Sequence, residues 1–112
     1  MSHQSIFEIQ AELCKCMSSA LRIEIVHILR DGPLRVSEIA RMTGHPMTTI
    51  SRHLGVLRNG GVVISQRQAQ DIYYQIANPK IVSICDLMRE VLIDEASRRS
   101  KFVEGLLDDH SG

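Results

Sequence analysis

Residues 48–61, TTISRHLGVLRNGG, combine apolar side chains at helical spacing with hydroxyl and basic side chains, and they end in two glycines. Ile50, Leu54 and Leu57 recur at positions i, i+4 and i+7, which is the spacing of one face of an α-helix. The other positions carry mostly hydrogen-bond donors, and the stretch contains no acid. The pattern therefore predicts a helix that packs one face on a core and offers donors to an outside partner rich in acceptors.

The charge distribution around this stretch favours a polyanionic partner, although the formal net charge of the 112-residue chain is zero. No acid occurs between Glu38 and Asp71, and this interval contains four arginines and two histidines. Residues 86–109 carry seven acids against four bases. A neutral total thus conceals a basic middle and a mildly acidic end, and a local basic face is what matters for binding phosphates.

The flanking patterns predict a single domain over residues 1–112. Helices are expected over about 5–17, within 18–33, over 36–43 and from Pro46 to the two glycines, followed by strands over 62–68 and 71–76 and a last helix over about 79–107. A short helix, a tight turn, a second helix and a β-hairpin form a winged helix-turn-helix. The expected fold is mainly α (α+β), with five helices, a two-stranded β-hairpin wing and a helical dimer interface.

A winged helix-turn-helix places the helix after the turn in the DNA major groove and the hairpin beside it. Arg52 is the strongest candidate for a base contact because a guanidinium pairs with two acceptors on guanine. Arg58 and Arg67 are expected to contact phosphates, which supply affinity but little sequence information. The full set of predicted DNA-binding residues is Thr48, Thr49, Ser51, Arg52, His53, Arg58, Arg67 and Gln68.

Residues 21–63, LRIEIVHILRDGPLRVSEIARMTGHPMTTISRHLGVLRNGGVV, followed by YYQI at 73–76, resemble the ArsR/SmtB family of transcriptional repressors. The resemblance implies a homodimer formed by the first and last helices, with each recognition helix in one half-site of an imperfect palindromic operator on double-stranded DNA. It also implies that a chemical signal releases the repressor. The residues independently favour a dimer, because two apolar-striped terminal helices flank a middle segment too small to bury both stripes.

This chain departs from the metal-sensing patterns of that family. Arg35 and Ser37 occupy the positions where many metalloid-sensing members carry Cys-x-Cys, and residues 79–109 contain no histidine. The usual metalloid site at the start of the third helix is therefore not expected, and neither is the usual zinc site of the last helix.

Three cysteines remain as candidates for a signal site: Cys14, Cys16 and Cys85. If they converge at a dimer interface, three thiolates would suit arsenite or another thiophilic metal ion. Two of them would instead suit a disulfide or persulfide link in an oxidant sensor. Residues i and i+2 of a helix point about 200° apart, so Cys14 and Cys16 share an ion only if the helix has ended by residue 14. The alternative is that all three are packing residues.

Other function classes find less support. The sequence shows no glycine-rich phosphate loop, metal-ligand cluster or nucleophile–base pair, so no enzyme is expected. It shows no membrane-spanning run and no signal peptide, so a cytoplasmic protein without a membrane partner is expected. A winged-helix protein-interaction module is the alternative to a DNA-binding repressor.

Overall fold

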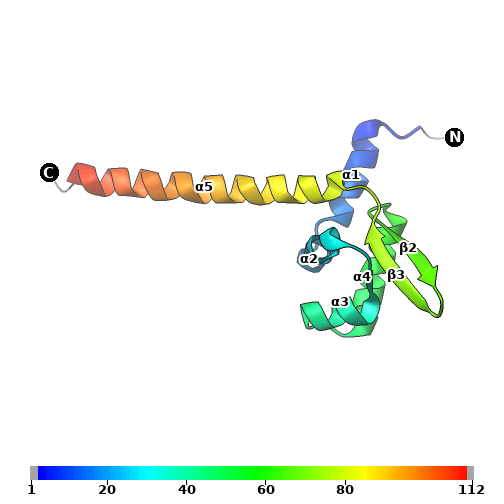
Figure 1. Ribbon diagram of the computed structural model, residues 1–112. Helices are drawn as coiled ribbons and strands as arrows, with labels where there is room; N and C mark the ends of the chain where they lie inside the picture. Colours follow the sequence, from blue (N-terminus) through cyan, green and yellow to red (C-terminus); the bar gives the residue numbers. More distant parts are fainter. Residues whose placement is uncertain (1–2, 111–112) are drawn as a thin grey trace. The chain divides into compact units, whose positions relative to one another are not determined.

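The computed structural model describes the backbone of residues 3–110 and the side chains of residues 3–108. The elements follow one another as α1 (Ile6–Cys16), α2 (Ala20–Ile28), the 3-10 helix η1 (Leu29–Asp31), β1 (Leu34–Arg35), α3 (Val36–Thr43), α4 (Met47–Asn59), β2 (Val63–Gln68), β3 (Asp71–Ile76) and α5 (Lys80–His110) (Figure 1). The predicted mainly helical class with five α-helices and a β-hairpin is confirmed.

The chain divides into two compact units, with the boundary after Val82. The first unit holds α1 to β3 and the start of α5, and the second holds the rest of α5. The predicted single domain over 1–112 includes terminal residues outside the described part, and it stays a prediction.

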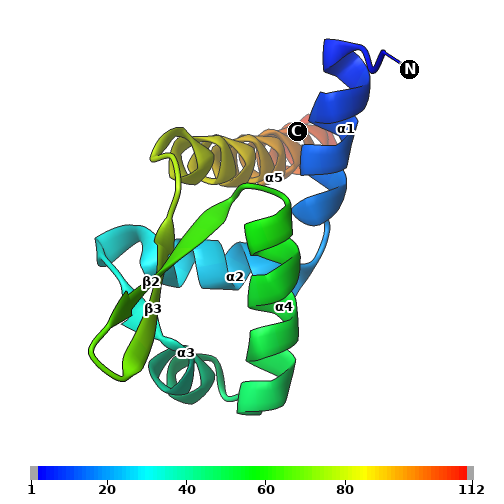
Figure 2. The same cartoon turned by 90° about the vertical axis from the view of Figure 1, so that its right-hand side faces the viewer.

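The core of the first unit lies between α2, α3, α4 and the start of β2 (Figure 2). Ile50, Leu54 and Leu57 are fully buried, which confirms the predicted inner face of α4. The side chains with less than 2% exposure are Ile25, Val26, Leu29, Ile39, Ile50, Leu54, Leu57, Val62 and Val63. Burial of these apolar groups is the main favourable term in folding this unit.

The turn between α3 and α4 has the geometry that its sequence predicts. Gly44 ends α3 in the left-handed region at φ 74°, and its N–H donates to the carbonyl of Ala40 at 2.9 Å. Pro46 then caps α4, where its missing N–H leaves no gap in the helix. This turn fixes α4 against α3.

The sheet has three antiparallel strands in the order β1-β3-β2, so the prediction of a two-stranded wing was incomplete. The additional strand is only two residues long and pairs Leu34 with Tyr74 and Arg35 with Tyr73. The β2–β3 hairpin turns through two residues, and Ala69 adopts a φ of 58°. A left-handed first residue in a two-residue turn matches the twist of the strands, which explains a tight turn without Asn-Gly.

The terminal helices carry apolar side chains on their surfaces. In α1, Ser5 caps the helix by accepting from the N–H of Glu8, and Ile6 and Phe7 are 68% and 77% exposed. In the second unit, α5 exposes Leu92 at 69% and Phe102 at 68%. No helix in the described part of the chain is long and apolar enough to cross a membrane.

Candidate nucleic-acid interface

The face of α4 opposite the core carries the predicted donors. Thr48, Ser51 and Arg52 are exposed, and Thr49 is half-buried on the flank. Helical geometry explains this for Thr48 and Arg52, since each is two positions from the buried Ile50 and so points about 200° away from it around the helix. Arg58, in the last turn of α4, is also exposed. The first turn of α4 holds no acid, so the positive end of the helix dipole is not neutralised there.

The wing supplies the second part of this surface. Arg67 and Gln68 are exposed at the end of β2, beside the turn at Ala69. Figures 1 and 2 place the tip of the wing and the first turn of α4 at the same end of the first unit. A duplex that meets the first turn of α4 is therefore close to the wing as well.

The two acids that bound the acid-free interval are both paired with one arginine. Arg35 lies between them, with its Nε 3.0 Å from Oε1 of Glu38 and its NH1 3.9 Å from Oδ2 of Asp71. The hydrogen bonds from Arg35 lower the pKa of the Glu38 carboxyl. Arg35 thus offsets negative charge beside the wing.

His53 contacts Arg22, a residue of α2 that the sequence analysis did not single out. Arg22 NH1 lies 3.3 Å from Nδ1 of His53, while Arg22 Nε donates to the carbonyl oxygen of Cys16 at 2.6 Å. Burial and then the positive charges of Arg22, Arg52 and His45 lower the pKa of His53. A neutral His53 that accepts at Nδ1 carries its proton on Nε2, so one donor remains for a partner.

Gly55 lies on the outward side of α4 near Arg52, and no internal contact requires a glycine there. A Cβ built on it meets nothing within 4 Å. Gly60 differs, because a Cβ there would lie 2.9 Å from Sγ of Cys16. A glycine inside a helix costs about 0.5–1 kcal/mol relative to alanine, and nothing within the first unit offsets this cost at Gly55.

The cysteines of α1 point in different directions, as helical spacing predicts. The helix continues through Cys16, with Cys14 exposed and Cys16 buried. Cys16 packs on the last turn of α4, its Sγ 3.7 Å from the carbonyl oxygen of Val56, and burial raises the pKa of its thiol. Cys85, in the second unit, is also buried. Among the residues that the structure describes, no three His, Cys, Asp or Glu side chains form a metal-binding group.

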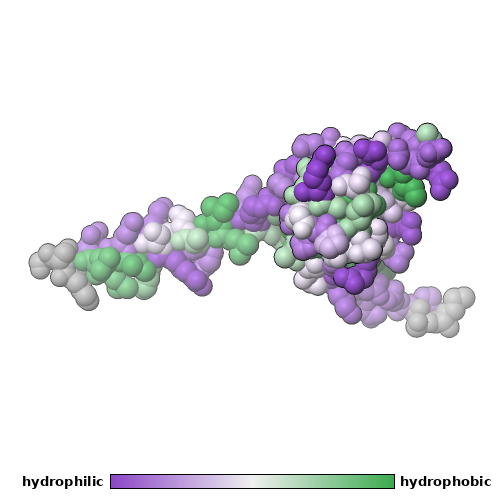
Figure 3. Space-filling view, turned by 90° about the horizontal axis from the view of Figure 1, so that it is seen from below, coloured by the Kyte–Doolittle hydropathy of each residue, from purple (hydrophilic) through white to green (hydrophobic). Residues whose placement is uncertain are grey.

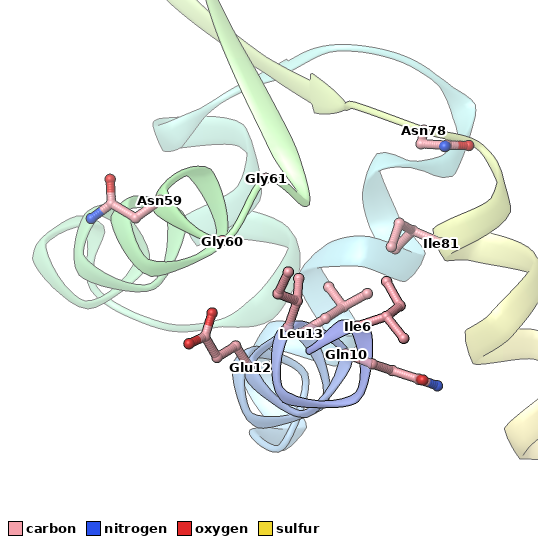
Figure 4. A pocket seen from close by; sticks show the side chains of 10 residues that line it. Ile6, Gln10, Glu12, Leu13, Asn59, Gly60, Gly61, Asn78 and Ile81 are labelled. Atoms are coloured by element: carbon pink, nitrogen blue, oxygen red, sulfur yellow. The ribbon is translucent and has the colours of Figure 1, made fainter. Parts of the chain in front are cut away.

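A groove of about 510 Å³ opens between α1, the end of α4 and the start of α5 (Figure 4). The side chains of Ile6, Leu13 and Ile81 point toward one another within it, and Glu12 lies at its edge. The groove adjoins Gly60 and Gly61, where α4 ends. It belongs to the supporting side of α4, away from the exposed donors.

Comparison with known proteins decides the family. Residues 19–65, which include α2, α3 and α4, match the model of the bacterial regulatory protein arsR family. The HTH-type transcriptional regulator Rv0081 of Mycobacterium tuberculosis is 31% identical over 107 residues, which cover 95% of this chain and 94% of that protein. The chain belongs to the ArsR family.

Solved structures of similar proteins have the same fold. The crystal structure of Rv0081 superposes with a TM-score of 0.77 over 87% of this chain and 98% of that one. The homodimeric winged helix-turn-helix DNA-binding domain of Mb0332 from Mycobacterium bovis is 31% identical, with a TM-score of 0.70 over 85% of this chain and 92% of that domain. The transcriptional repressor PagR of Bacillus anthracis is 38% identical over 85 residues, covering 75% of this chain and 85% of PagR.

The family and the fold make this chain a winged helix-turn-helix transcriptional regulator rather than an enzyme. The individual roles of the predicted DNA-binding residues and cysteines stay predictions. Sequence inspection missed two contacts: that of Arg22 with His53, and the packing of Cys16 against Gly60. Each contact joins segments that are far apart in the chain. The sequence does offer a signal for Gly55, because a glycine inside a helical pattern indicates a packing or functional requirement at that position.

Proposed function

We propose that this ArsR-family chain is a homodimeric repressor that binds an imperfect palindromic operator. Each subunit places α4 in the major groove and the β2–β3 wing against the phosphate backbone. Arg52 contacts a base edge, and Arg58 and Arg67 contact phosphates. Thr48, Thr49, Ser51, His53 and Gln68 supply the remaining donors.

The observation that carries this proposal is the division of α4 into two faces. Ile50, Leu54 and Leu57 are fully buried, whereas the opposite side presents Arg52 and hydroxyl donors with no acid among them. Base edges and phosphates in the major groove are rich in acceptors, so this face and a duplex are complementary. The exposed apolar side chains of α1 and α5 support the homodimer, and the related Mb0332 domain is homodimeric.

The test is a titration of the reduced protein against a duplex enriched from a random-sequence pool, at a series of salt concentrations. Phosphate neutralisation makes the affinity fall steeply as salt rises, with a slope close to the number of phosphates contacted. We expect a steep slope, one dimer per duplex and a two-fold symmetric consensus. A chain that enriches no sequence and binds duplexes without salt dependence would instead support the protein-interaction module.

We further propose that a thiol-based signal releases this repressor, through arsenite or another thiophilic ion, or through persulfide or an oxidant. Cys14 is exposed and can meet a reagent, and Cys16 touches the last turn of α4. Cys85 is the third proposed participant. A change at the end of α1 has a short route to α4, because Arg22 bonds both the Cys16 carbonyl and His53.

A second interpretation, that the cysteines only fill space, is favoured by the burial of Cys16 and Cys85 and by the raised pKa of the Cys16 thiol. Titration of the protein–duplex complex with arsenite, persulfide and peroxide, followed by mass measurement of the thiols, distinguishes the two. The thiol proposal predicts release that Cys85→Ser and Cys14→Ser abolish while duplex binding persists. Release that both variants retain, or no release by any reagent, would leave the cysteines as packing residues.

A further inference from the structure

A cleft of about 240 Å³ opens between the wing and the starts of α3 and α4, and we call it the wing cleft. Its lining residues are Arg35, Val36, Ser37, Met47, Gln70, Asp71 and Ile72. Figure 2 shows the tip of the wing at the same end of the first unit as α3 and the first turn of α4. Figure 3 views the first unit from this end and shows polar and apolar residues mixed on that face.

The wing cleft lies between two parts of the proposed duplex-binding surface. On the side of α4, Met47 directly precedes Thr48. In the sheet, Gln68 pairs with Asp71, and Arg35 pairs with the residue two positions after Asp71. Side chains two positions apart on a strand share one face of the sheet, so Arg35, Asp71 and Gln68 lie on the same face. A duplex that contacts both Thr48 and Gln68 therefore passes over the wing cleft.

The guanidinium of Arg35 is held in place at one edge. The backbone N–H and the Nε of Arg35 both donate to Oε1 of Glu38, at 3.2 Å and 3.0 Å. The distance from NH1 of Arg35 to Oδ2 of Asp71 is 3.9 Å, which is longer than a hydrogen bond. A guanidinium has five N–H donors in a rigid fork, and the Nε contact occupies one of them. The edge formed by NH1 and NH2 can therefore donate to an acceptor that enters the wing cleft.

We propose that the wing cleft receives the sugar–phosphate backbone of the operator, with the guanidinium of Arg35 bound to a phosphate. The inference rests on the proposed function and adds a residue to its DNA contacts. The fork of an arginine matches two phosphate oxygens, and its position is fixed here by Glu38. Met47 and Ile72 are 53% and 42% exposed, and they offer apolar walls against which a deoxyribose can pack.

Asp71 is the feature of the wing cleft that opposes a phosphate. Its side chain is 52% exposed, and its contact with Arg35 is long. Hydrogen bonds between a guanidinium and a phosphate are about 2.7–2.9 Å long, so Arg35 gains a shorter contact when a phosphate replaces Asp71 as its partner. The carboxylate of Asp71 then lies beside the bound backbone and repels it. This cost makes the location of the backbone measurable through Asp71 as well as through Arg35.

Replacing Arg35 with methionine tests the phosphate contact. Arg35→Met should raise the Kd for the selected operator about tenfold to a hundredfold near 0.1 M salt, because a dimer loses two phosphate contacts. It should also reduce the slope of log affinity against log salt by about two, since each contact contributes about 0.9. Circular dichroism reports whether the variant remains folded.

Arg89→Met is the matched control for the loss of charge. Arg89 is 45% exposed and lies 3.0 Å from Asp86 at i,i+3, whereas Arg35 is 43% exposed and lies 3.0 Å from Glu38 at i,i+3. Arg89 belongs to the second unit of the chain, away from the wing cleft. Its replacement should leave the Kd and the salt slope close to those of the wild type, with the oligomeric state of each variant measured by sedimentation.

Replacing Asp71 with asparagine separates a phosphate contact from simple charge neutralisation. Asp71→Asn leaves α3 and its contact with Arg35 Nε unchanged, and it should lower the Kd because a carboxylate beside the backbone is removed. If Arg35 binds a phosphate, Arg35→Met should raise the Kd in the Asp71→Asn protein by about as much as in the wild type. If Arg35 only neutralises Asp71, Arg35→Met should have little effect in the Asp71→Asn protein, and the inference would be wrong.

A scan of the operator with single methylphosphonate substitutions locates the contact on the DNA. Each substitution removes the charge of one phosphate. We expect one position in each half-site at which the wild type loses affinity and the Arg35→Met protein does not. The Arg89→Met protein should lose affinity at the same positions as the wild type.

The outcomes separate the inference from the proposed function. A wild-type chain that binds no duplex would overturn both. A wild type that binds its operator with a steep salt dependence, while a folded Arg35→Met protein keeps its Kd and slope, would overturn the inference alone. An Asp71→Asn protein with an unchanged Kd would also overturn it, because the backbone would then lie outside the wing cleft.

Discussion

Replacing Arg22 with methionine tests whether this residue supports the recognition helix from behind. Arg22 Nε donates to the carbonyl oxygen of Cys16 at 2.6 Å, and NH1 lies 3.3 Å from Nδ1 of His53. A hydrogen bond from a charged group contributes about 1.5–3 kcal/mol. The contact of Arg22 with His53 is longer and contributes less. Losing it costs less still, because the substitution also removes a positive charge that disfavours protonation of the His53 imidazole.

We therefore expect Arg22→Met to reduce the free energy of unfolding by about 2 kcal/mol. For a domain of this size, that reduction corresponds to a fall of about 10 °C in Tm. The methionine side chain keeps most of the apolar stem, so the loss reports the two hydrogen bonds rather than a cavity. Thermal denaturation followed by circular dichroism measures it.

The titration of His53 gives an independent readout. Its pKa lies below the ordinary 6.5, first because of burial and next because of the Arg22 charge. Removing Arg22 should move this pKa upward toward the ordinary value, measured by NMR. Below pH 6.5 the unfolded wild-type chain binds more protons than the folded one, so stability falls as pH decreases through this range. The variant should show a shallower decrease.

Arg58→Met is the matched control, since it removes the same charge from an exposed position of α4. It should change neither Tm nor the pKa of His53. The reasoning would be refuted by an Arg22→Met protein with wild-type Tm, or by a His53 pKa that stays where it was. An equal upward shift in the Arg58→Met protein would assign the effect to net charge instead.

Substitutions at Arg52, Gly55 and Gly60 test the recognition surface and its support. Arg52→Ala should cost about 1–3 kcal/mol of duplex affinity and broaden the selected consensus at one base pair, and an unaltered consensus would remove Arg52 from base recognition. Gly55→Ala should stabilise the fold by about 0.5–1 kcal/mol while weakening duplex binding, if the bare backbone approaches DNA there. The control is Gly105→Ala in α5, where an added Cβ also meets nothing within 4 Å and φ is not positive, and it should bring only the stability gain. Gly60→Ala should destabilise the fold by about 1–3 kcal/mol, because its Cβ would lie 2.9 Å from Sγ of Cys16. The destabilisation by Gly60→Ala should be smaller when Cys16 is also replaced with alanine. Denaturant unfolding of the wild type, the two single variants and the double variant measures this difference.

Local sequence signals predicted the helix-turn-helix well. Gly44 and Pro46 mark the end of α3 and the start of α4, and the sequence predicts α3 over its observed bounds. The helical spacing of Ile50, Leu54 and Leu57 identifies the buried face of α4. These features depend on neighbours within a few residues, where backbone stereochemistry and periodicity act directly.

The missed features depend on distant pairing. β1 has two residues, too few for an alternating pattern, and it exists because Leu34 and Arg35 pair with Tyr74 and Tyr73 of the wing. The contact of Arg22 with His53 spans 31 positions of sequence, and no local pattern announces it. The cysteines of α1 illustrate both cases. Helical periodicity predicts that Cys14 and Cys16 point in different directions, but only the packing against α4 shows that Cys16 is the buried one.

The fully buried core has one more consequence, which concerns how such a regulator can change over evolutionary time. Among the side chains that the structure describes, the nine with less than 2% exposure all belong to residues 25–63, and none of the described side chains of α1 or α5 is among them. Apart from the contact of Cys16 with the last turn of α4, substitutions in the terminal helices therefore leave this centre unchanged. The surfaces of α1 and α5 can therefore change in sequence during evolution while the packing of α2, α3 and α4 stays the same.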